Sequence, residues 1–482
     1  MEASTRLASA APRGRTRFEI LAYLLALTFA ASLGYGLFRM PVQVSDSLDE
    51  ILAVSRAPSA GAVFLTALHD DRAHLRALRP AQTKVLLDLA DGRYRLLFRG
   101  FHVVLLVALF LLFTRSLQVR TGDDFAAAAF ALTVLMGLHT FTGGIREAYP
   151  VNHFLEIGVC CLAVLNLAQS QGSVLADVLA SVMFVAAALT LESGLLVWVV
   201  AVAARLSGMR GISWAGVALM TTLLGGYAYL RVVHLGIASP ALGEREAGFW
   251  LGILTPAEQH ARFADTPALF FAYNVFTSLL SVIVSEPRGG IFVGVHSWLT
   301  GALLPRVWLG IVSSLLTTAV IAFVVWRALR RNGGVAEGDR RLLFVCAAVI
   351  LANATFTYAY VKDEILFPAG IFYALAAFVT VRHVVSRVGA RFVATAGLSI
   401  LLLGTGTLWA VRSLGVQYVM RSQAFKHRND WAQLPVEWQR RGRWPDDSHS
   451  RALIMRLRED ALAVPAPSPR LEPRWASQVW SD

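Results

Sequence analysis

Lysine is almost absent from this sequence. Lys84, Lys362 and Lys426 are the only lysines among 44 basic residues, so arginine supplies nearly all of the positive charge. Charged residues of both signs make up 16% of the chain, whereas 56% of it is hydrophobic. A single soluble globule cannot cover that much apolar surface with polar groups. The composition therefore excludes an ordinary soluble enzyme and predicts a membrane protein with many spans.

Cysteine is also scarce. Cys160, Cys161 and Cys346 all lie inside apolar runs, where a thiol behaves as a small hydrophobic group. This pattern argues against a disulfide framework or a cysteine-based metal centre. The sequence contains no Walker-type loop, zinc ligand set, nucleophile elbow or nucleic-acid-binding motif. Its net charge of +12 therefore predicts contact with anionic lipids or phosphates rather than with nucleic acid.

Long apolar runs fill most of the chain up to residue 413. Runs of about 20 residues are long enough to cross a bilayer as helices. We therefore predict an all-α, polytopic helical bundle with about 11–13 transmembrane helices. The expected spans are 18–38, 97–114, 124–140, 152–169, 173–189, 191–206, 213–231, 268–286, 306–327, 341–360, 364–382 and 390–413, with a shorter apolar segment at 289–304.

The arginines predict how these spans are oriented, because cytoplasmic loops are enriched in Lys and Arg. Four short loops carry such arginines, at 115–120, 205–210, 327–341 and 382–391. All four are cytoplasmic if the N-terminal tail 1–17 is cytoplasmic and 289–304 crosses the membrane. The exterior then receives the first loop 39–96, Glu147, the loop 232–267, Asp363 and the C-terminal segment. If 289–304 does not cross, the last third of the chain is inverted.

The apolar pattern stops after Arg412, and a polar segment, 414–482, follows. It contains Trp431, Trp438, Trp444, Trp475 and Trp480. Tryptophan rings favour the boundary between water and lipid, so we expect a small exterior appendage lying on the membrane surface. Within it we predict a helix over Arg451–Ala461 and an extended segment over Pro465–Pro473.

Acidic residues gather directly after the first span. If the chain turns helical after Ser45, Asp46 and Glu50 lie on one face, with Asp49 one turn from Asp46. Carboxylates that converge in this way can act as a general base. The alternative is a capping box over Ser47–Glu50, in which the same side chains satisfy the first amides of a helix.

The order of these features resembles the GT-C superfamily of polyprenyl-phosphate-sugar-dependent glycosyltransferases. The nearest likeness is to the branch of the TPR-containing protein O-mannosyltransferases and their bacterial relatives. The matching residues are Asp46, Asp49 and Glu50 after the first span, then Arg79-Pro80-Ala81, then Tyr94 to His102, and the turn Leu189 to Leu196 around Glu192. Two features differ from the family pattern. Leu191 replaces the Lys before the Glu of that turn, and His139 lies eight residues before Glu147 without a following Pro.

The resemblance implies an inverting transfer of a sugar from a polyprenyl-phosphate donor to a glycan, lipid or protein acceptor. It implies that Asp46, or Asp49, is the base, with Glu50 beside it. An arginine fork suits a lipid phosphate, and the candidates are Arg79, Arg99 and Arg146. Asp46 with Asp49 is also a candidate pair of ligands for a divalent ion. Because an Arg- and Ala-rich composition is typical of GC-rich bacterial genomes, we expect a bacterial inner membrane, with the active site facing the periplasm.

Further substrate-binding candidates each have a structural alternative. For Glu147 the alternative is a favourable negative charge at the start of the next helix. For Glu192 it is a place in an exposed turn, and for His102 it is a place in the core. Lys362 and Asp363 form either a charged entrance or a solvated turn. Ionisable residues at membrane depth are usually functional.

Two other classes of function stay open. A transporter or flippase for a lipid-linked or anionic substrate would use the same acidic residues along a path, and a scaffold would bind a partner through its Trp-rich tail. Transporters commonly show repeated halves with broken helices at the midplane. Here the ionisable residues cluster at one end of the predicted spans, which favours the enzyme.

Overall fold

A computed structural model gives the structure of the protein and describes residues 16–69, 75–237, 241–286, 289–302, 304–330, 333–388, 392–465 and 474–480. Helices account for most of this part of the chain. The strands it contains are β1 (Ala247–Phe249) and β2 (Gly252–Leu254), which pair antiparallel. The prediction of an all-α helical bundle is therefore confirmed.

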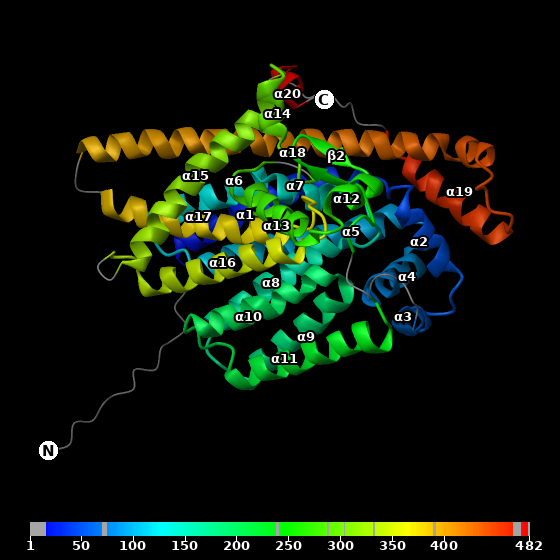
Figure 1. Ribbon diagram of the computed structural model, residues 1–482, viewed down its shortest axis with the longest axis horizontal. Coiled ribbons are helices and arrows are strands. Elements are labelled where there is room, and N and C mark those ends of the chain that lie inside the picture. Colours follow the sequence, from blue (N-terminus) through cyan, green and yellow to red (C-terminus); the bar gives the residue numbers. More distant parts are fainter. Residues whose placement is uncertain are drawn as a thin grey trace.

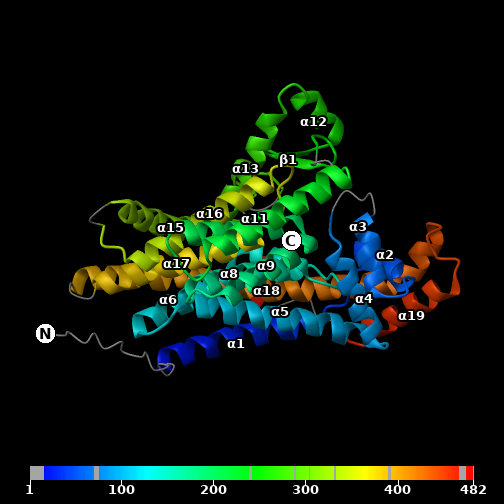
Figure 2. The same cartoon turned by 90° about the horizontal axis from the view of Figure 1, so that it is seen from below.

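Most helices lie along the long axis of the molecule (Figures 1 and 2). The bundle contains α1 (Arg17–Phe38), α5 (Tyr94–Leu117), α6 (Gly122–Gly137), α7 (His139–Arg146), α8 (His153–Gln169), α9 (Val174–Thr190), α10 (Leu196–Leu206), α11 (Trp214–Ala228), α13 (Pro267–Ile283), α15 (Pro305–Leu329), α16 (Glu337–Phe356), α17 (Phe367–Val388) and α18 (Phe392–Arg440). Short 3-10 and π segments, Glu192–Leu195 and Tyr229–His234, precede α10 and extend α11.

Several of these helices are long and apolar enough to cross a membrane. Five pass a test of length and hydropathy in the described chain, and the number rises to eight if each of three bent pairs is one span. The apolar helices α8 and α9 are shorter. The chain is therefore a multi-pass membrane protein, and the expected number of 11–13 spans stays a prediction.

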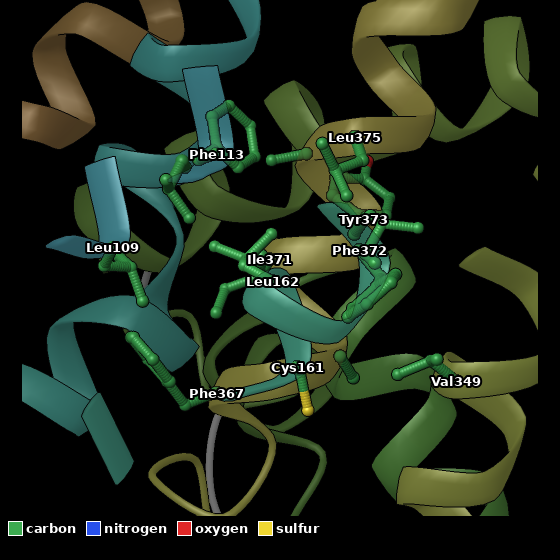
Figure 3. Packing of buried hydrophobic residues seen from close by; sticks show 14 of the residues in the cluster. Leu109, Phe113, Cys161, Leu162, Val349, Phe367, Ile371, Phe372, Tyr373 and Leu375 are labelled. Carbon is green, nitrogen blue, oxygen red and sulfur yellow. The ribbon is translucent and has the colours of Figure 1, made fainter. Parts of the chain in front are cut away.

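The core of the bundle is centred on α17, which other helices surround (Figure 3). Phe367, Ile371 and Phe372 are fully buried on this helix. Tight packing and small residues hold helices together in lipid, and Gly158 of α8 shows why. A Cβ at Gly158 would lie 2.7 Å from the ring of Phe367, so any larger residue would push the two helices apart. Cys161 lies in this core as a buried free thiol, as predicted.

The four arginine-containing loops meet at the end of the bundle where α1 begins. Residues from each of these loops line one hollow of about 280 Å³, including Gln118, Arg210, Arg341 and Arg382. Arg382 pairs there with Asp124, 3.7 Å away, and with Asp339. The predicted grouping of these loops at one end is confirmed.

The sequence leaves it open whether 289–304 crosses the membrane, and the described part of this segment contains no helix long enough to do so. Its helix α14 (Val293–Leu299) has seven residues, a length of about 10 Å. Residues 289–292 return instead to the β hairpin, where the Phe292 amide donates to the Trp250 carbonyl at 2.7 Å. The preceding helix α13 ends beside the middle of α15, since Thr318 donates to the Ile283 carbonyl. The chain thus enters the bundle and turns back, so the arginine-containing loops before and after this segment lie at the same end of the bundle.

The first loop folds as three helices, α2 (Asp46–Ser55), α3 (Ala60–His69) and α4 (Leu78–Ala90). Together with α19 (Ser448–Leu462) and the last turns of α18 they form what we call the cap, at the end of the bundle opposite the arginine loops (Figure 1). A separate apolar core holds the cap together. It contains Leu48, Ile51, Val54, Leu87, Phe98, Trp431, Leu434, Trp438, Ile454 and Leu457.

The C-terminal segment differs from the expected appendage. The helix does not end with the predicted span at residue 413, because α18 runs for 49 residues from Phe392 to Arg440, about 74 Å. Trp431 is 1% exposed and its indole N–H donates to the Val42 carbonyl at 2.6 Å. Trp431 and Trp438 therefore pack in the cap rather than at a membrane surface. Hydropathy did not predict this position, because it reports contact with lipid and does not detect burial against other parts of the protein. The predicted helix over 451–461 is confirmed by α19.

A proline inside α18 explains how the helix and α19 are joined. Pro435 has no N–H and cannot bond to the carbonyl one turn earlier. That carbonyl, on Trp431, accepts from Nε of Arg458 on α19 at 3.1 Å. Of the predicted extended segment 465–473, residues 466–473 lie outside the described part, as does the side chain of Trp475.

We predict that Trp431→Ala lowers the free energy of unfolding by about 3–5 kcal/mol, the usual cost of removing a buried tryptophan. Chemical denaturation in detergent measures this change. Trp298→Ala is the matched control, because that ring is 65% exposed, and it should change stability little. Equal stability of the two variants would contradict the buried position of Trp431.

Candidate functional site

The predicted helix after Ser45 exists, but the capping box does not form. Ser45 is the N-cap of α2 and makes no side-chain cap bond. Ser47 lies within the helix, and its buried hydroxyl has no partner in the described chain. The Glu50 carboxylate accepts from the hydroxyl of Thr83 on α4 at 2.6 Å. The acidic residues therefore face their surroundings rather than the start of their own helix.

Asp46, Asp49 and Glu50 line one hollow of about 510 Å³ between α2, α3 and α4. Asp49 pairs at 3.3 Å with Arg443, and both side chains are more than half exposed. Asp46 has no ion-pair or hydrogen-bond partner among the residues that the structure describes. Its carboxylate is exposed at the wall of the hollow and is available to a substrate.

Arg79 lies in the same hollow and connects α4 to the bundle. Its guanidinium contacts the Glu50 carboxylate at 2.8 Å and lies 4.9 Å from the ring centre of Tyr149. Its buried Nε has no hydrogen-bond partner within the described residues. Glu50 thus orients Arg79 and balances part of its charge, while one N–H remains unused.

Arg99 and His102 do not reach this hollow. Both are fully buried, and Nη1 of Arg99 lies 2.8 Å from Nδ1 of His102. Nη2 of Arg99 donates to the carbonyls of Ala148 and Tyr149 at 3.0 and 3.1 Å. The expected contact of these two residues with substrate is replaced by a structural role, because both Nη atoms of Arg99 and Nδ1 of His102 are used within the protein. Nε of Arg99 and Nε2 of His102 are buried without a hydrogen-bond partner in the described chain.

The backbone that Arg99 holds lies against the end of the first span. The backbone N–H of Gln43 donates to the backbone carbonyl of Ala148 at 3.0 Å. This bond, with the bond from Trp431 to Val42, fixes the three residues that precede α2. The position of Asp46 therefore depends on α5, on α18 and on the turn after α7.

A second hollow, of about 440 Å³, is lined in part by Gln43. Four predicted site residues line it, Arg146, Glu147, Lys362 and Asp363. Nε of Arg146 donates to Glu147 at 3.2 Å, and Asp363 lies 3.6 Å from Nε2 of His139. These residues come together as predicted, although not in the hollow of Asp46.

Tyr149 lies between these two groups of charges. Burial raises the pKa of its phenol to about 12; the carboxylates of Glu147, Glu364 and Asp46 raise it as well, while Arg79 lowers it. The neutral phenol can therefore donate a hydrogen bond throughout the physiological range. Burial also raises the pKa of Glu364.

Glu192 lies in a third hollow, of about 350 Å³. Arg76 contacts its carboxylate at 2.9 Å and Arg231 at 3.4 Å. Glu192 is thus neither an exposed turn nor part of the Asp46 hollow. The predicted single site is instead three hollows at the cap end.

Sequence reasoning missed several residues of these hollows. Arg76, Arg231, Tyr149, Lys426 and His427 all line a hollow or lie between two of them. The scarcity of lysine could have pointed to one of these hollows. The chain has three lysines, and two of them, Lys362 and Lys426, line the same hollow. Nothing local in the sequence marks Arg231, which meets Glu192 through the fold.

No family model, no curated protein and no solved structure matches this chain. The function is therefore inferred from the geometry at the cap end. That geometry combines an available carboxylate, an arginine that lines the same hollow, and a hollow large enough for a sugar-sized ligand.

We predict that Arg99→Lys lowers the free energy of unfolding by about 1.5–3 kcal/mol, the value of a hydrogen bond to a charged group. A lysine cannot donate to two carbonyls with the fixed geometry of an arginine fork. Chemical denaturation measures the loss, and hydrogen exchange should quicken at residues 147–149. Arg93→Lys, at an exposed position of the same end, is the control, and a similar effect there would contradict this role of Arg99.

Proposed function

We propose that the protein is a membrane glycosyltransferase of the GT-C type. It moves a sugar from a polyprenyl-phosphate donor to a glycan, lipid or protein acceptor. The observation that carries this proposal is the Asp46 carboxylate, which faces a hollow beside Arg79 and has no protein partner in the described chain. The resemblance of the motif around Asp46 to that superfamily supports it.

The proposed reaction uses Asp46 as a general base. As the acceptor hydroxyl attacks the anomeric carbon of the sugar, Asp46 takes up the hydroxyl proton. A new C–O bond forms, the bond from the anomeric carbon to the phosphate oxygen breaks, and polyprenyl phosphate leaves with that oxygen. Positioned cations stabilise the charge that develops on the leaving phosphate, and Arg79 is close enough to contribute.

Asp46 suits this role better than its neighbours do. Glu50 already accepts from Thr83 and contacts Arg79. Asp49 pairs with Arg443 at the exposed edge of the cap. A base must have a free oxygen within reach of the proton that it removes, and within the described residues neither oxygen of Asp46 has a partner.

The positions of the arginines support an exterior location for this site. The arginine-containing loops gather at the opposite end of the bundle, and cytoplasmic loops are enriched in Arg. The cap end would then face the periplasm of a bacterial inner membrane. Membrane lipids would surround the bundle.

The contacts of Arg412 argue against a transporter. Arg412 is buried beside the middle of α15, where a substrate path would run. Its Nη1 donates to Ser313 at 2.8 Å and Ser314 at 3.0 Å, and its Nη2 to Ser285 at 3.0 Å. These bonds tie the end of α13 to α15 and α18, so Arg412 acts as a structural clamp.

We predict that Asp46→Asn lowers sugar transfer by about 10²–10⁴-fold, the range for loss of a general base. Asp49→Asn is the matched control and should change transfer by less than about fivefold, since an exposed ion pair is worth at most about 1 kcal/mol. Mass spectrometry of glycolipids and glycoproteins from cells that carry each variant measures the product. Full transfer by folded Asp46→Asn protein would contradict the proposal.

A further inference from the structure

The hollow beside Glu192 combines a charged end with apolar walls. Arg76 and Arg231 provide the charge, and the ring of Phe356 belongs to the walls. The other apolar and aromatic lining residues are Leu191, Leu195, Tyr358, Ala359, Tyr360 and Ile365. A ligand that fills this hollow needs an anionic group at one end and a hydrocarbon part at the other.

Positive charge exceeds negative charge around this hollow. Glu192 is the one acid among its lining residues, against two arginines. A further cation, Arg245, lies over the ring of Tyr360 at 5.5 Å from its centre. Lys362 lies 5.6 Å from the same ring but pairs with Glu364 at 3.9 Å. A ligand with more negative charge than a single carboxylate would balance this surplus.

The Glu192 carboxylate shows the geometry that the two arginines accept. Nε and Nη2 of Arg76 both donate to its Oε2, at 3.2 and 2.9 Å. Nη1 of Arg231 approaches the other oxygen at 3.4 Å. Two arginines that converge on one oxyanion from different sides match phosphate, whose oxygens accept from several donors at once.

A buried hydroxyl in the same place has no partner. Ser193 is 4% exposed and lines the hollow, and its Oγ makes no hydrogen bond within the described chain. A buried polar group without a partner is costly. A phosphate held by Arg76 and Arg231 would provide the acceptor that the Ser193 hydroxyl lacks.

Position links this hollow to the proposed base. Arg76 lies three residues before Arg79, which lines the Asp46 hollow. The segment 76–80 therefore has one hollow on each side. A lipid phosphate bound by Arg76 would lie beside the arginine that faces Asp46.

We propose that this hollow binds a phosphate-headed lipid. Its phosphate replaces the Glu192 carboxylate between Arg76 and Arg231 and accepts from Ser193, and its first hydrocarbon units lie along the apolar walls. The identification of this lipid with the sugar donor rests on the proposed function, whereas its binding does not. Binding to the Asp46→Asn variant therefore separates the two: it should remain normal even if transfer fails or was never the function.

The test is binding of undecaprenyl phosphate to the purified protein in detergent, followed by native mass spectrometry. Dioleoyl phosphatidic acid and inorganic phosphate are the parallel probes. Arg76→Gln and Arg231→Gln should each weaken lipid binding by at least about tenfold, the value of one hydrogen bond to a charged group. Arg93→Gln, at an exposed arginine of the same end, is the control and should bind normally.

A variant that is expected to tighten lipid binding distinguishes the loss of a binding contact from a folding defect. Glu192→Gln removes the competing carboxylate and should tighten lipid binding by about tenfold, which a folding defect cannot do. Tighter binding of undecaprenyl phosphate than of phosphatidic acid identifies a polyprenyl lipid as the ligand, and the reverse identifies a membrane phospholipid. Unchanged binding in both arginine variants, or inorganic phosphate binding as tightly as either lipid, would overturn the proposal.

Discussion

The hydrogen bond from the Gln43 amide to the Ala148 carbonyl joins the end of the first span to the turn after α7. Arg99 holds the same turn from inside the bundle, and Trp431 holds the first span from the cap. Because α2 begins three residues after Gln43, these bonds set where Asp46 points. Two buried donors from distant parts of the chain thus position a carboxylate that has no protein partner of its own within the described residues.

Charge at the cap end is divided among three hollows rather than pooled in one. Glu50 balances Arg79, Glu147 balances Arg146, and Glu192 lies between Arg76 and Arg231. Only the last group leaves a clear surplus of positive charge among its lining residues. This division suits a protein that handles a neutral sugar and an anionic lipid in adjacent places, with the segment 76–80 between them.

Much of the architecture could be predicted because its signals are local. Hydropathy marked most of the bundle helices, arginine-rich loops marked a shared end, and the residues after Ser45 marked the start of α2. Whether the segment 289–304 crosses the membrane stayed open, because an apolar run that turns back against a hairpin has the same composition as a short span. The 49-residue α18 was missed because its polar part is buried by the cap rather than by lipid.

The candidate site was harder to predict, because it depends on contacts between residues far apart in the chain. The pair of Arg76 and Glu192 spans 116 positions, and only the packed bundle brings the two together. Arg99 could not be separated from Arg79 by residue type, although one is fully buried and the other lines a hollow. Local patterns thus identified the acidic residues, and the fold decided which of them remained available.

The most direct test of the central claim is a structure of the protein in a lipid nanodisc with a polyprenyl-phosphate sugar and an acceptor bound. We expect an Asp46 oxygen within about 3.2 Å of the acceptor hydroxyl, with the anomeric carbon on the far side of that hydroxyl. A sugar bound in the hollow of Glu147 and Lys362, with no substrate atom in contact with Asp46, would contradict this account.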